Sequence, residues 1–216
     1  MNKKTKTALC LAVCLLATFL LWTAAVCVVD VAAIGPRSSA VGLATLNQFV
    51  HRLTGVHITL YTVTDWLGLV PLGVALGFAV LGLVQWIRRK RLRQVDYSIL
   101  VLGGFYLIVI AEYLLFETVT VNHRPVLING YLETSYPSST TMLVLCVMPT
   151  AILQLHSRIR HPLLRQGTAL CIGSFTVFMV ISRLLAGVHW FSDIVGGILL
   201  SGGLVMLYVF AVRLKE

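Results

Sequence analysis

The segment ISRLLAGVHWFSD, residues 181 to 193, contains four side chains suited to phosphoryl transfer: Ser182, Arg183, His189 and Asp193. His189 and Asp193 are four positions apart, a spacing that puts two side chains on one helix face, so we expect the carboxylate to orient the imidazole. An oriented imidazole can accept a phosphoryl group while an arginine grips its oxygens in a fork. The segment therefore predicts His189 as a nucleophile and Arg183 as a phosphate ligand. The alternative is a helix cap whose arginine touches lipid head groups.

Two further clusters precede this segment. In NHRPVL, Pro125 disfavours helix at Arg124, so this arginine is expected in a loop, where it can clamp the same phosphate. In SYPSSTT, residues 135 to 141, a proline and several hydroxyl residues come directly before an apolar run, which predicts a helix N-terminus with free backbone N–H groups. Such an end binds anions, with simple capping as the alternative. The phosphate-binding candidates here are Ser138 and Ser139, followed by Thr140.

Composition places these clusters in a membrane protein. The chain has 216 residues, of which 58% are hydrophobic and 12% charged, and its mean hydropathy is +0.90. A bilayer core of about 30 Å needs roughly 20 apolar residues per helix. We therefore expect an all-α, polytopic membrane protein with six transmembrane helices in one bundle. The six expected spans are 7–29, 67–87, 98–116, 139–156, 168–187 and 194–212.

The basic residues predict the orientation of the bundle. With the N-terminus inside, 13 of the 17 lysines and arginines fall on the cytoplasmic side, which fits the positive-inside rule and puts both termini in the cytoplasm. The formal charge of +9 comes from short clusters beside apolar runs, so membrane lipids are the expected partner and nucleic acid is not. We read the first span as a retained anchor, with a secretory signal as the alternative.

Other polar residues have less specific interpretations. The external connection 30–66 contains apolar residues at helical spacing, which predicts a helix on the outer membrane surface, with His51 and His57 as interfacial groups. Glu112 lies inside an expected span, so it should face the bundle interior, either bonding a neighbouring helix or pointing toward a site. The five cysteines lack metal-site spacing and are read as packing residues. We expect no metal and no cofactor.

The three clusters together resemble the motifs of the type 2 phosphatidic acid phosphatase family, membrane lipid phosphatases related to vanadium haloperoxidases. That family has a lysine separated by six residues from Arg-Pro, then Pro-Ser-Gly-His, and then Ser-Arg, five residues, histidine, three residues and aspartate. The third motif is complete here, and the resemblance covers roughly residues 60 to 212, with motifs at 117–125, 137–140 and 182–193 of a single membrane domain, 1–216. It implies a phosphohistidine at His189.

Departures from the family pattern in two of the motifs bear on catalysis. Glu117 stands at the lysine position of the first motif, and Ser139 and Thr140 replace the glycine and histidine of the second. In the family that histidine protonates the leaving oxygen, a role that is typically worth about 10² to 10⁴ in rate and that a threonine cannot fill as an acid. An alcohol needs this proton and a phosphate leaving group does not, so we expect a lipid diphosphate to be the better substrate. His123 and Glu117 are the candidate replacement acids.

The resulting expectation is a lipid phosphatase or diphosphatase acting on a (poly)prenyl diphosphate or phospholipid phosphate at the outer face of a plasma membrane, in a bacterium. Its catalytic residues would be His189, Asp193 and Thr140, and its phosphate ligands Arg124, Ser138, Ser139 and Arg183. The alternative is a catalytically silent relative that binds or moves phospholipid head groups. Phosphotransfer to an acceptor other than water would use the same intermediate.

Overall fold

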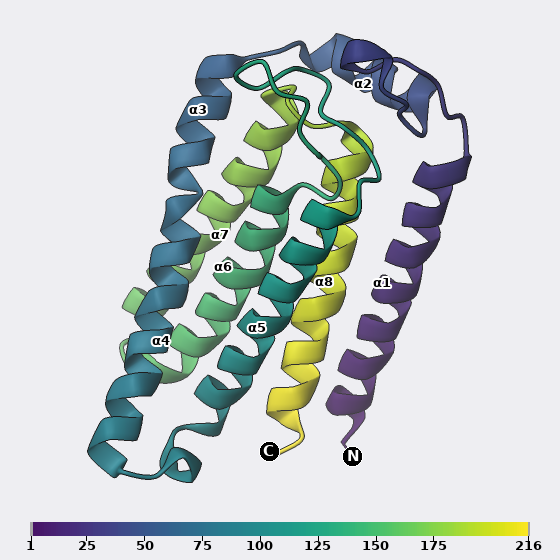
Figure 1. The fold of residues 1–216 in the computed structure, drawn as a ribbon. Helices are drawn as coiled ribbons and strands as arrows, with labels where there is room; N and C mark the ends of the chain where they lie inside the picture. The colour runs from purple at the N-terminus through teal and green to yellow at the C-terminus, as the bar shows by residue number, and fades with distance from the viewer. Residues whose placement is uncertain (1, 216) are drawn as a thin grey trace.

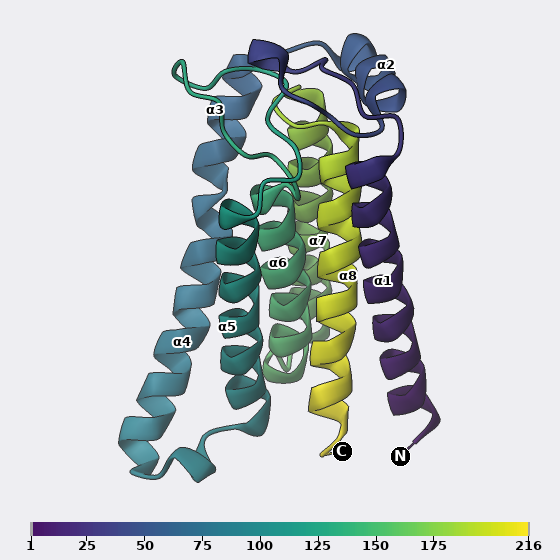
Figure 2. The same ribbon diagram turned by 45° about the vertical axis from the view of Figure 1, so that its right-hand side comes forward.

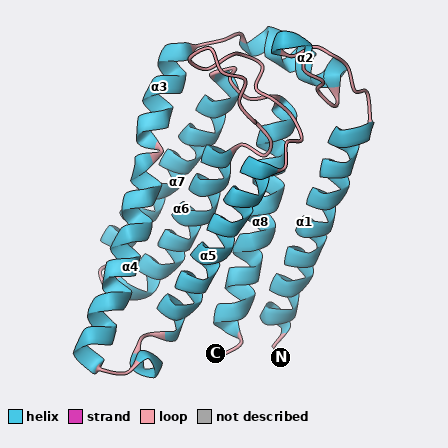
Figure 3. Ribbon diagram, viewed as in Figure 1, coloured by secondary structure: helices cyan, strands magenta, loops and turns pink. Residues whose placement is uncertain are grey.

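The computed structural model describes residues 2–215 and shows a bundle of helices (Figure 1). The helices are α1 (Lys3–Val28), α2 (Ala44–Thr54), α3 (Ile58–Leu67), α4 (Leu69–Arg89), α5 (Tyr97–Thr118), α6 (Ser139–Arg158), α7 (Pro162–Leu185) and α8 (Phe191–Arg213), with short 3₁₀ turns at Pro36–Ser38 and Leu92–Gln94. Within residues 2–215 there is no strand, only isolated bridges in the loops (Figure 3).

Among the described residues, six helical segments are long and apolar enough to cross a membrane, which confirms the expected all-α, multi-pass architecture. One boundary differs from the expectation. Residues 58–66, assigned to an external connection, form α3, and α3 continues through Gly68 into α4 as a single candidate span, Ile58–Arg89. Gly68 keeps right-handed helical backbone angles, so the chain barely changes direction there. The second span therefore extends further toward the site than hydropathy indicated.

Both termini lie at one end of the bundle, and α2 lies across the other end together with the long loops (Figures 1 and 2). The expected surface helix thus exists as α2, although Val41 and Leu43 precede it. Phe49 and Leu53 are 60% and 71% exposed on α2, the apolar side chains that an interfacial helix would present to lipid.

The most buried spans are α6 and α8, at the centre of the bundle, and half of the most apolar stretch of each is buried, against 22% or less in the other four. Small residues allow this close approach: Ser201 Oγ on α8 donates to the carbonyl of Met142 on α6, at 3.3 Å. A Cβ at Gly197 would lie 3.2 Å from Thr141, as the small-residue spacing of α8 predicted. The first turns of α6 and α8 are therefore held together at the end that carries α2.

The cysteines and α1 occupy the outside of this core. All five cysteines are unpaired, and the reading of them as packing residues holds only for the buried Cys146, because the other four are exposed on the helix surfaces. Helix α1 lies along α8 (Figure 2). Trp22 Nε1 donates to the carbonyl of Ser192 at 3.1 Å, and the Thr23 hydroxyl contacts the Tyr136 hydroxyl at 2.7 Å. The first helix thus supports the loops around the site.

Candidate active site

The three sequence clusters meet at the end of the bundle that carries α2. His189 lies in the turn between α7 and α8, where Gly187 has a positive φ of 66° and packs against the backbone of the α2–α3 junction. A Cβ at Gly187 would lie 1.9 Å from the carbonyl oxygen of Gly55, so only glycine fits there. This close contact fixes the turn and, with it, the direction of the His189 side chain.

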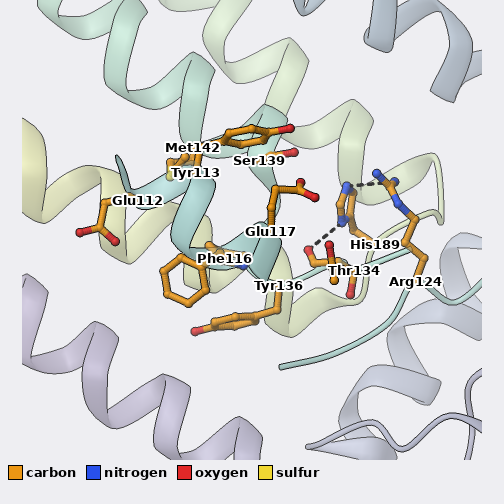
Figure 4. Close-up of a pocket in the computed structure, with 12 residues that line it drawn as sticks. Glu112, Tyr113, Phe116, Glu117, Arg124, Thr134, Tyr136, Ser139, Met142 and His189 are labelled. Atoms are coloured by element: carbon orange, nitrogen blue, oxygen red, sulfur yellow. Dashed lines mark hydrogen bonds between the residues drawn. The ribbon is translucent and has the colours of Figure 1, made fainter. Parts of the chain in front are cut away.

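The contacts of His189 define which ring nitrogen carries the proton. Nε2 lies 3.4 Å from Arg124 Nη1 and 3.5 Å from Arg183 Nη2. A guanidinium group has donors but no acceptor, so Nε2 must be the acceptor and be unprotonated. Nδ1 therefore carries the proton, and it donates to the backbone carbonyl of Ser135 at 3.2 Å. The free lone pair of Nε2 faces both arginines, and Figure 4 shows the contact with Arg124.

Burial keeps this imidazole neutral. The side chain is 3% exposed, and the pKa of His189 is lowered to about 4, chiefly by burial and also by Arg124 and Arg183, with Asp193 opposing them. At neutral pH the ring is therefore uncharged and available as a nucleophile. A negatively charged ligand between the arginines would offset their effect on the ring.

Asp193 supports the ring less directly than its spacing indicated. Helix α8 begins at Phe191, after His189, so the two residues do not share a helix face. The Asp193 carboxylate instead accepts the backbone N–H of Trp190 at 2.9 Å and caps α8, and its Oδ2 lies 3.8 Å from His189 Nδ1. The hydrogen-bond partner of Nδ1 is the Ser135 carbonyl, and Asp193 contributes a fully buried negative charge beside it.

Asn122 contacts that carboxylate directly, and Asn47 reaches it through Ser192, whose Oγ donates to Asp193 Oδ1 at 3.4 Å. Asn122 Nδ2 donates to Asp193 Oδ1 and to Ser192 Oγ, both at 3.3 Å. Asn47 on α2 donates to Ser192 Oγ at 2.9 Å and accepts the Ser192 N–H at 3.0 Å. Both amides are buried. They link α2 and the loop after α5 to the start of α8, and nothing in their local sequence marked them.

Both arginines predicted as phosphate ligands lie beside the nucleophile. Arg183 is 1% exposed, and apart from His189 its polar partners are distant for a buried cation: Thr64 Oγ1 at 3.4 Å and Asp65 Oδ1 at 3.8 Å. Arg124 is more accessible and pairs with Glu133, whose Oε2 lies 2.9 Å from Nε. A buried guanidinium with such weak partners is costly, so an anion between these groups would be bound strongly.

Helix α3 adds an unforeseen wall to the site. The Tyr61 ring lies under both guanidinium groups, 5.0 Å from Arg183 Cζ and 5.9 Å from Arg124 Cζ, which favours their side-by-side placement through cation–π contact. Thr64 and Asp65, one turn further along, are the partners of Arg183. Hydropathy placed residues 58–66 in the external connection, so it did not predict that this segment lines the site.

The hydroxyl residues of the second cluster diverge. Ser139, in the first turn of α6, lines the pocket that contains His189 and Arg124. Ser138 is fully buried, its hydroxyl accepts a hydrogen bond from Thr141 at 3.0 Å, and it does not line this pocket. Thr140 lines an adjacent apolar groove with Asp65 and Leu69 instead. The structure therefore brings only Ser139 of these three to the nucleophile.

Figure 4 shows the pocket and its acidic residues. Glu117 lies in it, close to Ser139 and toward His189, and Glu112 lies at the far end from His189. Of the two expectations for Glu112, a bond to a neighbouring helix or a position facing a site, the structure favours the second, because Glu112 lines the pocket. The side chain of His123 does not line the pocket, although its backbone carbonyl accepts from Trp190 Nε1 at 2.8 Å. Of the two candidate acids, the geometry retains Glu117.

Comparisons with known proteins show which family and fold this chain resembles. The family model described as the PAP2 superfamily matches residues 109–215. A solved structure, described as the first transmembrane PAP2 type phosphatidylglycerolphosphate phosphatase from Bacillus subtilis, aligns over 95% of this chain and 96% of its own, with a TM-score of 0.52 and 22% identity. At that identity the likeness shows the fold alone. No curated protein sequence gave a match.

Proposed function

This chain belongs to the PAP2 superfamily, and from that premise we propose that it removes phosphate from a membrane lipid phosphate or diphosphate through a phosphohistidine at His189. The family match bears out the general class of enzyme, a lipid-phosphatase-type hydrolase. The observation that carries the specific proposal is the convergence of two guanidinium groups on the unprotonated Nε2 of one buried histidine. An anion attracted by the arginines is brought directly to the nucleophile.

In the first step, the Nε2 lone pair attacks phosphorus, the bond from phosphorus to the leaving oxygen breaks, and that oxygen departs with the bonding electrons. Arg124 and Arg183 neutralise the phosphoryl oxygens, and the first-turn N–H groups of α6 beside Ser139 add a positive dipole. The Ser135 carbonyl and the Asp193 charge stabilise the positive ring that forms. In the second step, the oxygen of water attacks phosphorus and the phosphorus–Nε2 bond breaks. Its electron pair returns to Nε2, and phosphate leaves with the protons of the water.

The leaving group decides which substrate suits this site. No imidazole stands at position 140, and the Thr140 side chain points into the neighbouring groove, so no strong acid reaches the leaving oxygen from the second motif. An alkoxide, whose parent alcohol resembles water with a pKa of about 15.7, leaves slowly without a proton, whereas a phosphate with a second pKa of about 6 leaves without help. We therefore propose a lipid diphosphate, such as a polyprenyl diphosphate, as the better substrate. Glu117 is the candidate to replace the missing acid.

The distribution of basic residues indicates on which side of the membrane the site lies. Most basic residues flank the end of the bundle that carries both termini, so the site lies at the opposite, external face of the plasma membrane, with both termini cytoplasmic. A bacterial plasma membrane fits this proposal. Phosphotransfer to a lipid or sugar hydroxyl would share the first step and differ only in the acceptor.

The test is phosphate release by the purified protein from a panel of lipid monophosphates and diphosphates. We expect release from both classes, faster from undecaprenyl diphosphate than from phosphatidate, and loss of release in His189→Ala. His123→Ala is the matched control, because that ring lies outside the pocket, and it should retain activity. Faster turnover of phosphatidate would refute the leaving-group argument. Lipid binding without release in the unaltered protein would instead identify a silent relative.

A further inference from the structure

One hydroxyl in the pocket has no assigned role. Ser135 precedes the second cluster in the loop between α5 and α6, is 3% exposed and lines the pocket with His189 and Ser139. Its Oγ is buried and has no hydrogen-bond partner among the described residues. Buried hydroxyl groups are nearly always hydrogen-bonded, so an unpartnered one that lines a pocket indicates a ligand atom that completes it.

The backbone of Ser135 fixes this hydroxyl in place. Its N–H donates to the carbonyl of Asn122 at 3.0 Å, and its carbonyl accepts the Nδ1 proton of His189 at 3.2 Å. The next residue, Tyr136, is 2% exposed and anchored to Thr23 of α1 through its hydroxyl. The backbone around Ser135 is thus held by buried contacts, so it needs no rearrangement to meet a ligand.

The other buried groups without a partner belong elsewhere. Arg124 Nε is beside Glu133, and Arg183 Nε belongs to a guanidinium already aimed at the anion site. Ser39 Oγ is unpartnered in the turn before α2 and lines none of the pockets around the site. Ser135 is therefore the residue whose free donor and location in the pocket coincide.

We propose that Ser135 is a catalytic residue whose Oγ–H donates a hydrogen bond to a phosphoryl oxygen of the bound substrate. This inference rests on the proposed function and adds a ligand outside the Ser138, Ser139 and Thr140 cluster. The two arginines donate hydrogen bonds to some of the phosphoryl oxygens. The neutral Ser135 hydroxyl donates to a further oxygen without adding a charge near His189. Because the same residue holds the Nδ1 proton through its carbonyl, it joins nucleophile orientation and phosphate binding in one backbone unit.

Ser135→Ala separates this role from a structural one. The substitution leaves both backbone contacts intact and removes an atom with no partner in the free protein, so the melting temperature should be unchanged or higher. Phosphate release should fall by about 10²-fold, mainly in kcat, as for the loss of one donor to a developing oxyanion. Ser135→Thr, which keeps a hydroxyl, should restore part of the rate. Ser39→Ala, the matched removal of an unpartnered hydroxyl outside the pocket, should leave the rate unchanged.

A second measurement does not depend on turnover. Inorganic phosphate should raise the melting temperature of the unaltered protein and raise it less in Ser135→Ala. Equal protection in both proteins, or a full rate in Ser135→Ala, would overturn the inference, as would a lower melting temperature without phosphate. If no lipid releases phosphate but inorganic phosphate protects the two proteins unequally, the proposed function fails while the assignment of Ser135 to an anion site stands.

Discussion

The charge of Arg183 should control the pH at which His189 becomes active. The pKa of His189 is held at about 4, against an ordinary value of 6.5, and burial is the largest cause. Arg183 Nη2 lies 3.5 Å from Nε2, and two unit charges at that distance interact by about 5 kcal/mol at an effective dielectric constant of 20. That is an upper limit, because guanidinium charge is delocalised and burial, not Arg183, is the largest cause of the shift. Removing the charge should therefore raise the pKa of His189 by roughly one unit.

The assay is the pH dependence of kcat/KM in two variants, Arg183→Gln and Arg183→Lys. Both lose the bidentate grip on phosphate and should be slower, but lysine keeps the positive charge. Neutral imidazole is the active form, so activity falls as pH drops through the pKa of His189. We expect the acid limb to lie at higher pH in Arg183→Gln than in Arg183→Lys. Titration of the substrate is common to both, so coincident acid limbs would refute the electrostatic argument.

Three other outcomes follow from single contacts. Glu133→Gln removes the carboxylate that competes for Arg124, so inhibition by inorganic phosphate should strengthen about two- to five-fold, whereas weaker inhibition would mean that Glu133 supports the arginine. Gly187→Ala forces a Cβ into a neighbouring backbone carbonyl at a positive φ, so the melting temperature and the rate should both fall, and a fully active variant would show that the turn before His189 tolerates displacement. Thr140→Ala should change the rate of phosphate release less than about two-fold because its side chain lies outside the pocket, and a ten-fold loss would place it in the mechanism.

The chemistry of the nucleophile was readable in the sequence because it depends on residue types. The sequence predicts His189 as the nucleophile and Arg183 and Arg124 as two external cations. In the structure both guanidinium groups lie within 3.5 Å of His189 Nε2. The partner of Nδ1 was not readable. It is a backbone carbonyl, which every residue possesses, so no side-chain pattern distinguishes Ser135 from its neighbours.

Helix α3 shows a second limit. Its polar side chains lie among apolar ones in a short segment, and hydropathy averaged over a span does not resolve which side of one helical turn faces an arginine. Tyr61 and Asp65 acquire their roles only because α3 packs beside α7, more than a hundred residues away in the chain.

The sequence by itself determined the membrane setting, the number of spans and the kinds of groups available for phosphoryl transfer, because hydropathy and functional groups are properties of residues taken one at a time or in short windows. Only the tertiary structure decided which of Ser138, Ser139 and Thr140 reaches the pocket. Consecutive residues in the first turn of a helix point about 100° apart, and the packing of α6 against α8, α4 and α5 selects the direction that faces His189.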